Sequence, residues 1–145
     1  MDSTRTFTSS KSWFVSLALL GTSLFLAVMT IQDFLTAGSL AGKLIFLGFS
    51  LAMIGLLLWT WFGTYYRVAG HHLYYRCGPL HGRIPIQEIR IVKQKERLWS
   101  GLRPALGLHG LILHYHKWDE IYLSPKDKEA FVKALQEINP SIQVK

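Results

Sequence analysis

Residues 44–66, LIFLGFSLAMIGLLLWTWFGTYY, contain no charged side chain over 23 positions. Residues 12–32, SWFVSLALLGTSLFLAVMTIQ, form a second uncharged stretch of 21 positions. An α-helix rises about 1.5 Å per residue, so roughly 20 apolar residues cross a hydrocarbon core of about 30 Å. The sequence therefore predicts a transmembrane helical hairpin at 13–63, with spans at about 13–31 and 44–62.

Two other interpretations of these stretches are weaker. Buried helices of a soluble protein need a large core around them, and only about 80 residues follow the second stretch. A cleaved signal peptide usually has an apolar region of about 7–15 residues followed by a small-residue cleavage site. The first stretch is longer than that and lacks a clear site, so we expect an uncleaved anchor.

The distribution of basic residues predicts the orientation of this hairpin. Of the 16 Lys and Arg residues, 13 lie at or after Arg67, and the segment between the two stretches carries only Lys43. Because positively charged segments stay in the cytoplasm, we expect a multi-pass protein of the cell membrane with both termini cytoplasmic. Residues 1–12 are then a cytoplasmic tail. The single cysteine, Cys77, suits a reducing compartment.

Residues 65–140 have the pattern of a small α+β domain. Short aromatic or alternating runs predict antiparallel strands, and the glycines at 70 and 78 predict turns between them. The motif SPKD at 124–127 is typical of a helix start. An apolar stripe at helical spacing follows it, formed by Phe131, Ala134, Leu135 and Ile138. We therefore expect several strands, then one C-terminal helix, with 141–145 as a tail.

Two motifs of this domain carry a resemblance to a known family. They are RCGPLHGRIPIQEI at 76–89 and DEIYLSPKD at 119–127, which leads into the helix. In this order, after a two-helix anchor, they resemble the YyaB-like bacterial pleckstrin-homology (PH) domain proteins over about 65–140. The resemblance implies a PH-like fold, an antiparallel sheet or small barrel with one C-terminal helix. The strand count is short for a seven-stranded PH barrel, so either one strand lies in 93–102 or the barrel is incomplete.

A basic segment provides the candidate binding residues of the domain. Five cations occur within 14 residues, with Glu96 as the one opposing charge and an aromatic residue between them. We expect the lipid- or partner-binding residues to be Arg90, Lys93, Lys95, Arg97, Trp99 and Arg103. Near an anionic leaflet each favourable cation contributes about 1 kcal/mol. The alternative is a solvated strand face that keeps the protein soluble.

The sequence contains no catalytic signature. Six histidines invite a metal hypothesis, but no His-Glu-x-x-His motif, paired cysteine or nearby run of acids accompanies them. A Gly-rich phosphate loop and a nucleophile elbow are also absent. We therefore expect no enzyme activity, no metal site and no cofactor. The histidines are His71, His72, His81, His109, His114 and His116.

Three functions remain open at this stage. The first is a membrane-anchored PH-like module that scaffolds a protein partner at the cytoplasmic membrane face, or that self-associates. The second is a module that engages anionic lipids with residues 90–103. A metal-dependent enzyme or metal sensor is a distant third. A nucleic-acid partner is not expected, because no nucleic-acid motif accompanies the domain's 13 basic and 7 acidic residues.

Overall fold

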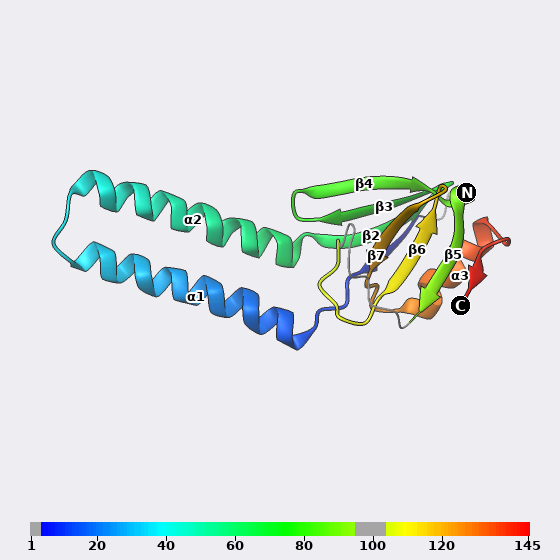
Figure 1. Cartoon of the computed structure of the whole chain (residues 1–145), viewed down its shortest axis with the longest axis horizontal. Helices are drawn as coiled ribbons and strands as arrows, with labels where there is room; N and C mark the ends of the chain where they lie inside the picture. Colours follow the sequence, from blue (N-terminus) through cyan, green and yellow to red (C-terminus); the bar gives the residue numbers. More distant parts are fainter. Residues whose placement is uncertain (1–3, 95–103) are drawn as a thin grey trace.

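The chain has two parts, a long helical hairpin and a β-rich domain at the open end of that hairpin (Figure 1). A computed structural model describes residues 4–94 and 104–145. The hairpin lies along the longest axis of the molecule, with its loop at one extreme and the domain at the other. Both helices lie wholly within the described residues.

The hairpin consists of α1 (Trp13–Leu35) and α2 (Leu40–Phe62), each of 23 residues. At about 1.5 Å per residue each helix is about 35 Å long, and both are apolar enough to cross a membrane. Within α2 the only buried residue is Ser50, and α1 has none. The hairpin thus exposes apolar side chains along its whole length, which suits a lipid environment.

Each helix extends beyond its predicted span toward the connecting loop, so that Asp33 lies within α1 and Lys43 within the first turn of α2. The Lys43 Nζ atom donates to the carbonyl oxygens of Phe34 at 2.9 Å and Thr36 at 2.5 Å, near the end of α1. A flexible lysine can carry its charge out to a helix end in this way. The cation thereby satisfies carbonyl groups that the end of α1 leaves free.

Gly48, Ala52 and Gly55 of α2 do not mediate the packing of the two helices. No atom lies within 4 Å of the position that a Cβ atom would occupy at Gly48 or at Gly55. Ala52 is exposed on the same helix. This small-residue face of α2 therefore points away from α1.

The first sheet has four antiparallel strands in the order β1-β2-β3-β4. They are β1 (Arg5–Thr8), β2 (Thr64–Ala69), β3 (His72–Cys77) and β4 (Leu80–Pro85). Gly70 and Gly78 occupy the two predicted turns with φ values of 56° and 57°, a region that glycine adopts without a steric penalty. One face of the sheet is buried and the other is exposed to solvent.

The second sheet has the order β7-β6-β5-β8. Its strands are β5 (Ile89–Gln94), β6 (Leu111–Tyr115), β7 (Asp119–Leu123) and β8 (Gln143–Val144). A 3-10 turn, η1 (Ile86–Glu88), connects β4 to β5. The short β8 pairs in parallel with β5, so the region expected as a C-terminal tail at 141–145 contributes a strand.

One core lies between the sheets and α3 (Lys128–Ile138), which packs its apolar stripe inward. Phe131 and Leu135 are fully buried, as are Leu73 and Ile84 of the first sheet and Leu113 of the second. The helix begins later than SPKD predicts. The N-cap residue is Asp127, whose carboxylate accepts a hydrogen bond from the backbone N–H of Ala130 at 3.0 Å. The predicted cap residue, Ser124, is instead buried at the end of β7.

The hairpin is inserted between the first two strands of the domain. Residues 1–12 were expected as a tail, yet β1 lies in this segment and pairs with β2 across the hairpin, Arg5 opposite Val68 and Thr8 opposite Tyr65. Beyond β1 the chain also contacts the end of β7, where Ser9 and Pro125 form an antiparallel bridge. The described residues form eight strands in two sheets that do not close into a barrel, and the strand predicted within 93–102 falls largely outside the described residues.

A buried polar network fixes the hairpin connections to the domain. The Tyr66 hydroxyl donates to the Pro104 carbonyl at 2.8 Å, accepts from the Ser124 N–H at 3.1 Å and lies 3.4 Å from the Ser9 hydroxyl. Ser9 and Ser124 also share a hydrogen bond of 3.0 Å. Because these groups are buried, each unmade bond would be costly. The network joins the segment before α1, the strand after α2 and the end of β7.

Candidate functional site

The outer face of the first sheet brings together basic and aromatic side chains from β2, β3 and β4. Alternation along β2 buries Thr64, Tyr66 and Val68, so Tyr65 and Arg67 point outward. The strand register then aligns two rows across the sheet. We call the following six residues the basic face: Tyr65, Arg76 and His81 in the row nearer the hairpin, and Arg67, Tyr74 and Arg83 in the next row.

Three arginines surround Tyr74 on this face. Arg67 and Arg83 lie directly opposite Tyr74 on the two neighbouring strands, and Arg76 lies two residues along β3. Directly opposed residues have Cβ atoms about 4.5–5.5 Å apart, so the two arginines and the tyrosine are neighbours on one face of the sheet. The Arg76 Nε atom donates to the Gly78 carbonyl at 3.5 Å. The Arg67 guanidinium also lies 5.9 Å from the centre of the Tyr65 ring, within the range of a cation–π contact.

Acidic side chains do not neutralise the basic face. The strands β1 to β4 contain neither Asp nor Glu. Arg5, on the buried side of the sheet, pairs with Glu137 of α3 at 3.1 Å. Within 4–94 and 104–145, no carboxylate forms an ion pair with any arginine of the basic face. This surface therefore carries about three uncompensated positive charges.

A groove of about 700 Å³ lies over the basic face. Thr4, Ala69, Tyr75 and Gly82 complete its lining. Gly82 lies directly opposite Tyr75 on the other face of the sheet, where a Cβ atom would lie 2.3 Å from the Tyr75 hydroxyl oxygen. The groove is open to solvent and has the volume of a small-molecule site.

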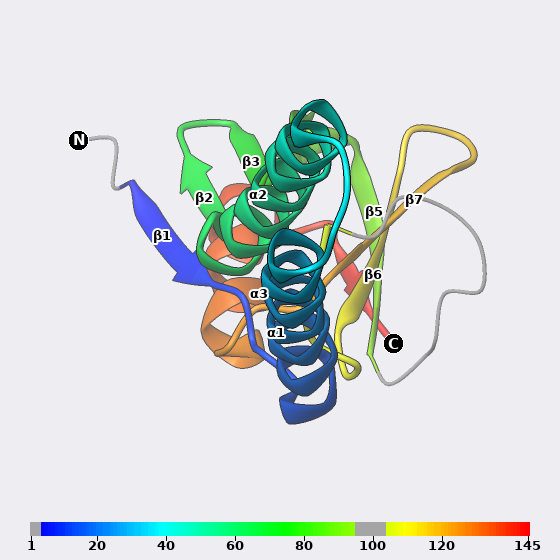
Figure 2. The ribbon, with the colours of Figure 1, turned by 90° about the vertical axis from the view of Figure 1, so that its left-hand side faces the viewer.

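The basic face begins immediately beside the hairpin. Figure 1 shows the β3–β4 turn next to the end of α2, and a Cβ atom at Gly78 would lie 2.9 Å from the Thr60 hydroxyl oxygen. Leu80 in the same turn is 53% exposed. On the other connection, the Lys11 Nζ atom lies 4.4 Å from the centre of the Trp61 ring. Figure 2 gives a view along the hairpin. The strands β2 and β3 lie close to α2, whereas β5, β6 and β7 lie to the right of both helices in that view.

The two described residues of the predicted basic segment lie on the second sheet. Arg90 is exposed and Lys93 is half-buried, and both are on β5 of the second sheet. They are therefore not part of the basic face. The other four predicted residues lie outside the described residues: Lys95, Arg97, Trp99 and Arg103.

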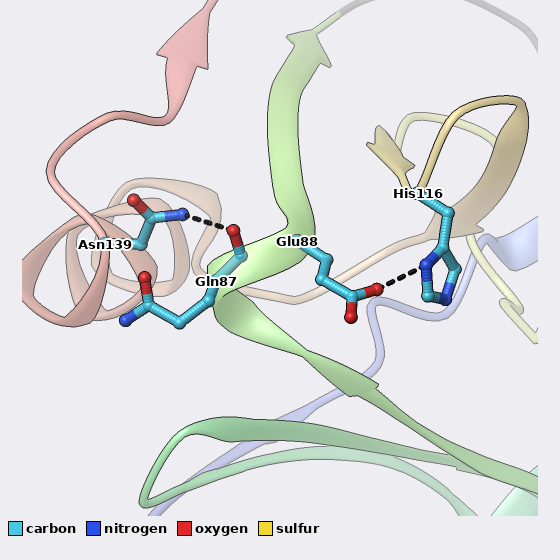
Figure 3. Close-up of polar contacts among 4 residues, drawn as sticks. All are labelled: Gln87, Glu88, His116 and Asn139. Carbon is cyan, nitrogen blue, oxygen red and sulfur yellow. Dashed lines mark hydrogen bonds and ion pairs between the residues drawn. The ribbon is translucent and has the colours of Figure 1, made fainter.

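Two of the six histidines, His114 and His116, form separate ion pairs with glutamates. His114 Nδ1 lies 3.0 Å from a Glu120 carboxylate oxygen. His116, in the turn after β6, pairs with Glu88 of η1 (Figure 3). On the other side of η1, the Asn139 amide donates to the Gln87 carbonyl at 3.4 Å. In the part of the chain that the structure describes, no three His, Cys, Asp or Glu residues gather as metal ligands would.

The basic face is not predicted from the sequence, because its residues are scattered along the chain. Arg67, Arg76 and Arg83 are separated by nine and seven residues and form no run of charge. Their proximity follows from the register of two hairpins, β2–β3 and β3–β4. The two turn glycines give that register, so combining each turn with strand alternation predicts which side chains share a face.

Comparisons with known proteins agree with this architecture. The bacterial PH domain family matches residues 64–139. The chain is also 33% identical over 103 residues to the uncharacterized protein YyaB of Bacillus subtilis (strain 168), which covers 70% of each chain. No solved structure matches the chain. The family match begins at β2, so it includes the basic face but not β1 or the hairpin.

Proposed function

Because the chain belongs to the bacterial PH domain family, we propose that it is a binding module for an anionic ligand at the cytoplasmic surface of the cell membrane. Two transmembrane helices hold it there, and it acts by binding and not by catalysis. The observation that carries this proposal is the basic face, with three arginines that lack acidic partners beside the end of α2. PH-like domains are binding modules, which is consistent with a ligand on an exposed sheet face.

The charge distribution supports the cytoplasmic orientation. The domain side of the chain carries all but one of the Lys and Arg residues, since Arg5 and Lys11 precede α1 and 13 more follow α2. The loop between the helices lies at the opposite end of the hairpin. Cytoplasmic segments retain such an excess of positive charge.

The insertion of the hairpin supports a fixed position of the domain on the membrane. The chain enters and leaves the hairpin through the two adjacent strands β1 and β2, and the Tyr66 network binds both connections. A domain held at two points cannot rotate freely, as one on a flexible linker does. The basic face is therefore kept at the height of the lipid head groups.

The anionic ligand is tested with the full chain in nanodiscs of a zwitterionic lipid. Fluorescent polyglutamate and polyphosphate are the probes, at low and high salt. We expect both probes to bind at low salt, and R67Q/R76Q/R83Q to remove most of the binding. The matched control R90Q/K93Q changes two cations outside the basic face and should retain it. Equal binding by the two variants would contradict the proposal.

A protein partner is the second candidate, because one surface of the domain suits it. Trp118 is 85% exposed in the turn between β6 and β7. Tryptophan is enriched among the residues that dominate protein interfaces. The residues predicted at 90–103 remain a further proposal for lipid contact. A photoreactive residue placed at position 118 tests this candidate by crosslinking in cells. A crosslinked protein would indicate a partner at Trp118, because a ligand bound to the basic face is not reached from that position.

A further inference from the structure

We propose that the groove over the basic face binds a phosphate group, carried either by a lipid head group or by a soluble phosphate ester. This inference rests on the proposed function and names the chemical class of its ligand. Arg67, Arg76 and Arg83 hold the phosphate oxygens, and Tyr74 occupies the register position between Arg67 and Arg83. Nothing in the sequence motifs or in the family match assigns such a site.

The arrangement of the arginines favours phosphate over carboxylate. Arg67 and Arg83 flank Tyr74 on the two neighbouring strands, and Arg76 lies two residues from Tyr74 along β3. A guanidinium presents a planar fork that matches two oxygens of one anion. A carboxylate has two oxygens in one plane and suits a single fork. A phosphate monoester has three terminal oxygens and about −1.5 to −2 charge near pH 7, which matches three cations around one point.

The aromatic residues prepare the site for a small ligand. Tyr65 and Tyr74 provide flat apolar walls, and the contact of Arg67 with the Tyr65 ring limits the freedom of that guanidinium. His81 adds a ring whose Nδ1 atom lies 3.1 Å from the Pro79 carbonyl oxygen. A groove of about 700 Å³ accommodates a head group or a small ester, whereas a folded protein would contact a larger area.

The height of the groove allows both sources of phosphate. Tyr65 is three residues after the end of α2, and the two rows of the basic face are two residues apart, about 7 Å along the strands. The polar layer of each leaflet is about 5–7 Å thick. The nearer row thus lies in the head-group layer, and the farther row faces the water above it.

The test uses the full chain in two arms. In the soluble arm, glycerol 3-phosphate and acetate at matched ionic strength are added to the chain in phosphatidylcholine nanodiscs, and the melting temperature is measured. In the lipid arm, nanodiscs of mixed phosphatidic acid and phosphatidylcholine are dissociated in the mass spectrometer, and the lipid retained on the chain is counted. Stabilisation by glycerol 3-phosphate alone assigns a soluble ester. Retention of phosphatidic acid alone assigns a head group.

Arginine substitutions test whether the stabilisation by glycerol 3-phosphate or the retention of phosphatidic acid depends on the basic face. R67Q, R76Q and R83Q should each weaken the response roughly ten-fold, and R76K should restore part of it, since charge-assisted bonds to arginine are strong and directional. R90Q is the control and should respond like the natural chain. Their melting temperatures without ligand should match, because all four arginines are on exposed positions of the sheets. Polyglutamate binding with no preference for phosphate in either arm would overturn this inference alone. Loss of both polyanion and phosphate binding would overturn the proposed function as well.

Discussion

The hydroxyl oxygen of Tyr66 lies 3.1 Å from the backbone nitrogen of Ser124, and this contact joins the strand after the hairpin to the end of β7. The same hydroxyl donates to the Pro104 carbonyl. Both groups are buried, so neither finds water if the hydroxyl is removed. Tyr66 therefore joins the strand after the hairpin to the second sheet, alongside the Ser9–Ser124 hydrogen bond.

Tyr66→Phe should destabilise the domain by about 2 kcal/mol, because it leaves the Ser124 N–H and the Pro104 carbonyl without their partner. Thermal unfolding of the full chain in nanodiscs, followed by near-UV circular dichroism, measures the change. Tyr65→Phe is the matched control, since Tyr65 lies on the outer face and should change stability by less than about 0.5 kcal/mol. Equal effects of the two substitutions would argue against the network.

The same tyrosine predicts a loss of stability at alkaline pH. Burial raises the pKa of Tyr66 above its usual value of 10.0, and its hydrogen bonds with Ser9 and Ser124 offset only part of that rise. The folded state therefore holds the phenol proton more tightly than the unfolded state. The stabilisation is complete below about pH 10 and is lost as the pH rises through the raised pKa of the folded state. The natural chain should lose more stability than Tyr66→Phe between about pH 10 and 11; parallel pH curves for the two chains would contradict this.

The insertion of the hairpin predicts which shortened chain folds in water. Replacing residues 13–62 by a Gly/Ser linker of about ten residues, which spans about 18 Å, should give a soluble folded domain. Removing residues 1–63 should not, because it also deletes β1 and the contact of Phe7 with Phe131, whose ring centres are 5.2 Å apart. Burial of one such side chain contributes about 1.5–3 kcal/mol. The dispersion of ¹H–¹⁵N NMR spectra compares the two chains, and a well-dispersed spectrum from the second would show that β1 is dispensable.

Two glycines of the domain should differ in their tolerance of a methyl group. A Cβ atom at Gly110 would lie 2.3 Å from the backbone carbonyl oxygen of Leu123, which is held in β7. Gly110→Ala should therefore cost several kcal/mol, about 3 or more, through displacement of the strand. At Gly82 the nearest atom belongs to the end of the Tyr75 side chain, which can move. Gly82→Ala should cost about 1–2 kcal/mol. Similar melting temperatures for both variants would refute the difference.

The parts of the fold that depend on local signals were predicted from the sequence. The long apolar runs indicated α1 and α2, and the stripe at Phe131 and Leu135 indicated α3. The PH-like fold itself is confirmed by the family match and by the two sheets with one C-terminal helix. These features need only the periodicity of neighbouring residues, which tertiary packing did not override.

The parts that depend on distant contacts were not predicted. β1 has only four residues and pairs with β2 across the whole hairpin, so no local pattern marks it as a strand of the domain. Ser124 has the composition of a helix cap, but its burial beside Ser9 and Tyr66 draws it into another network and leaves the cap to Asp127. The basic face arises from strand register and not from a run of charge. The local charge pattern therefore predicted binding residues at 90–103 and not on this face.

The most direct test of the central claim measures where the basic face lies relative to the membrane. Leu80, at the β3–β4 turn, and Trp118, at the far end of the domain, are each replaced by cysteine in a Cys77→Ser chain and labelled with a fluorophore. We predict that a membrane-impermeant maleimide reaches both positions only in inverted vesicles. Lipids that carry a quencher on the head group should then quench the label at position 80 strongly and the label at position 118 weakly. Labelling in sealed cells, or equal quenching at the two positions, would contradict a basic face held at the cytoplasmic surface of the membrane.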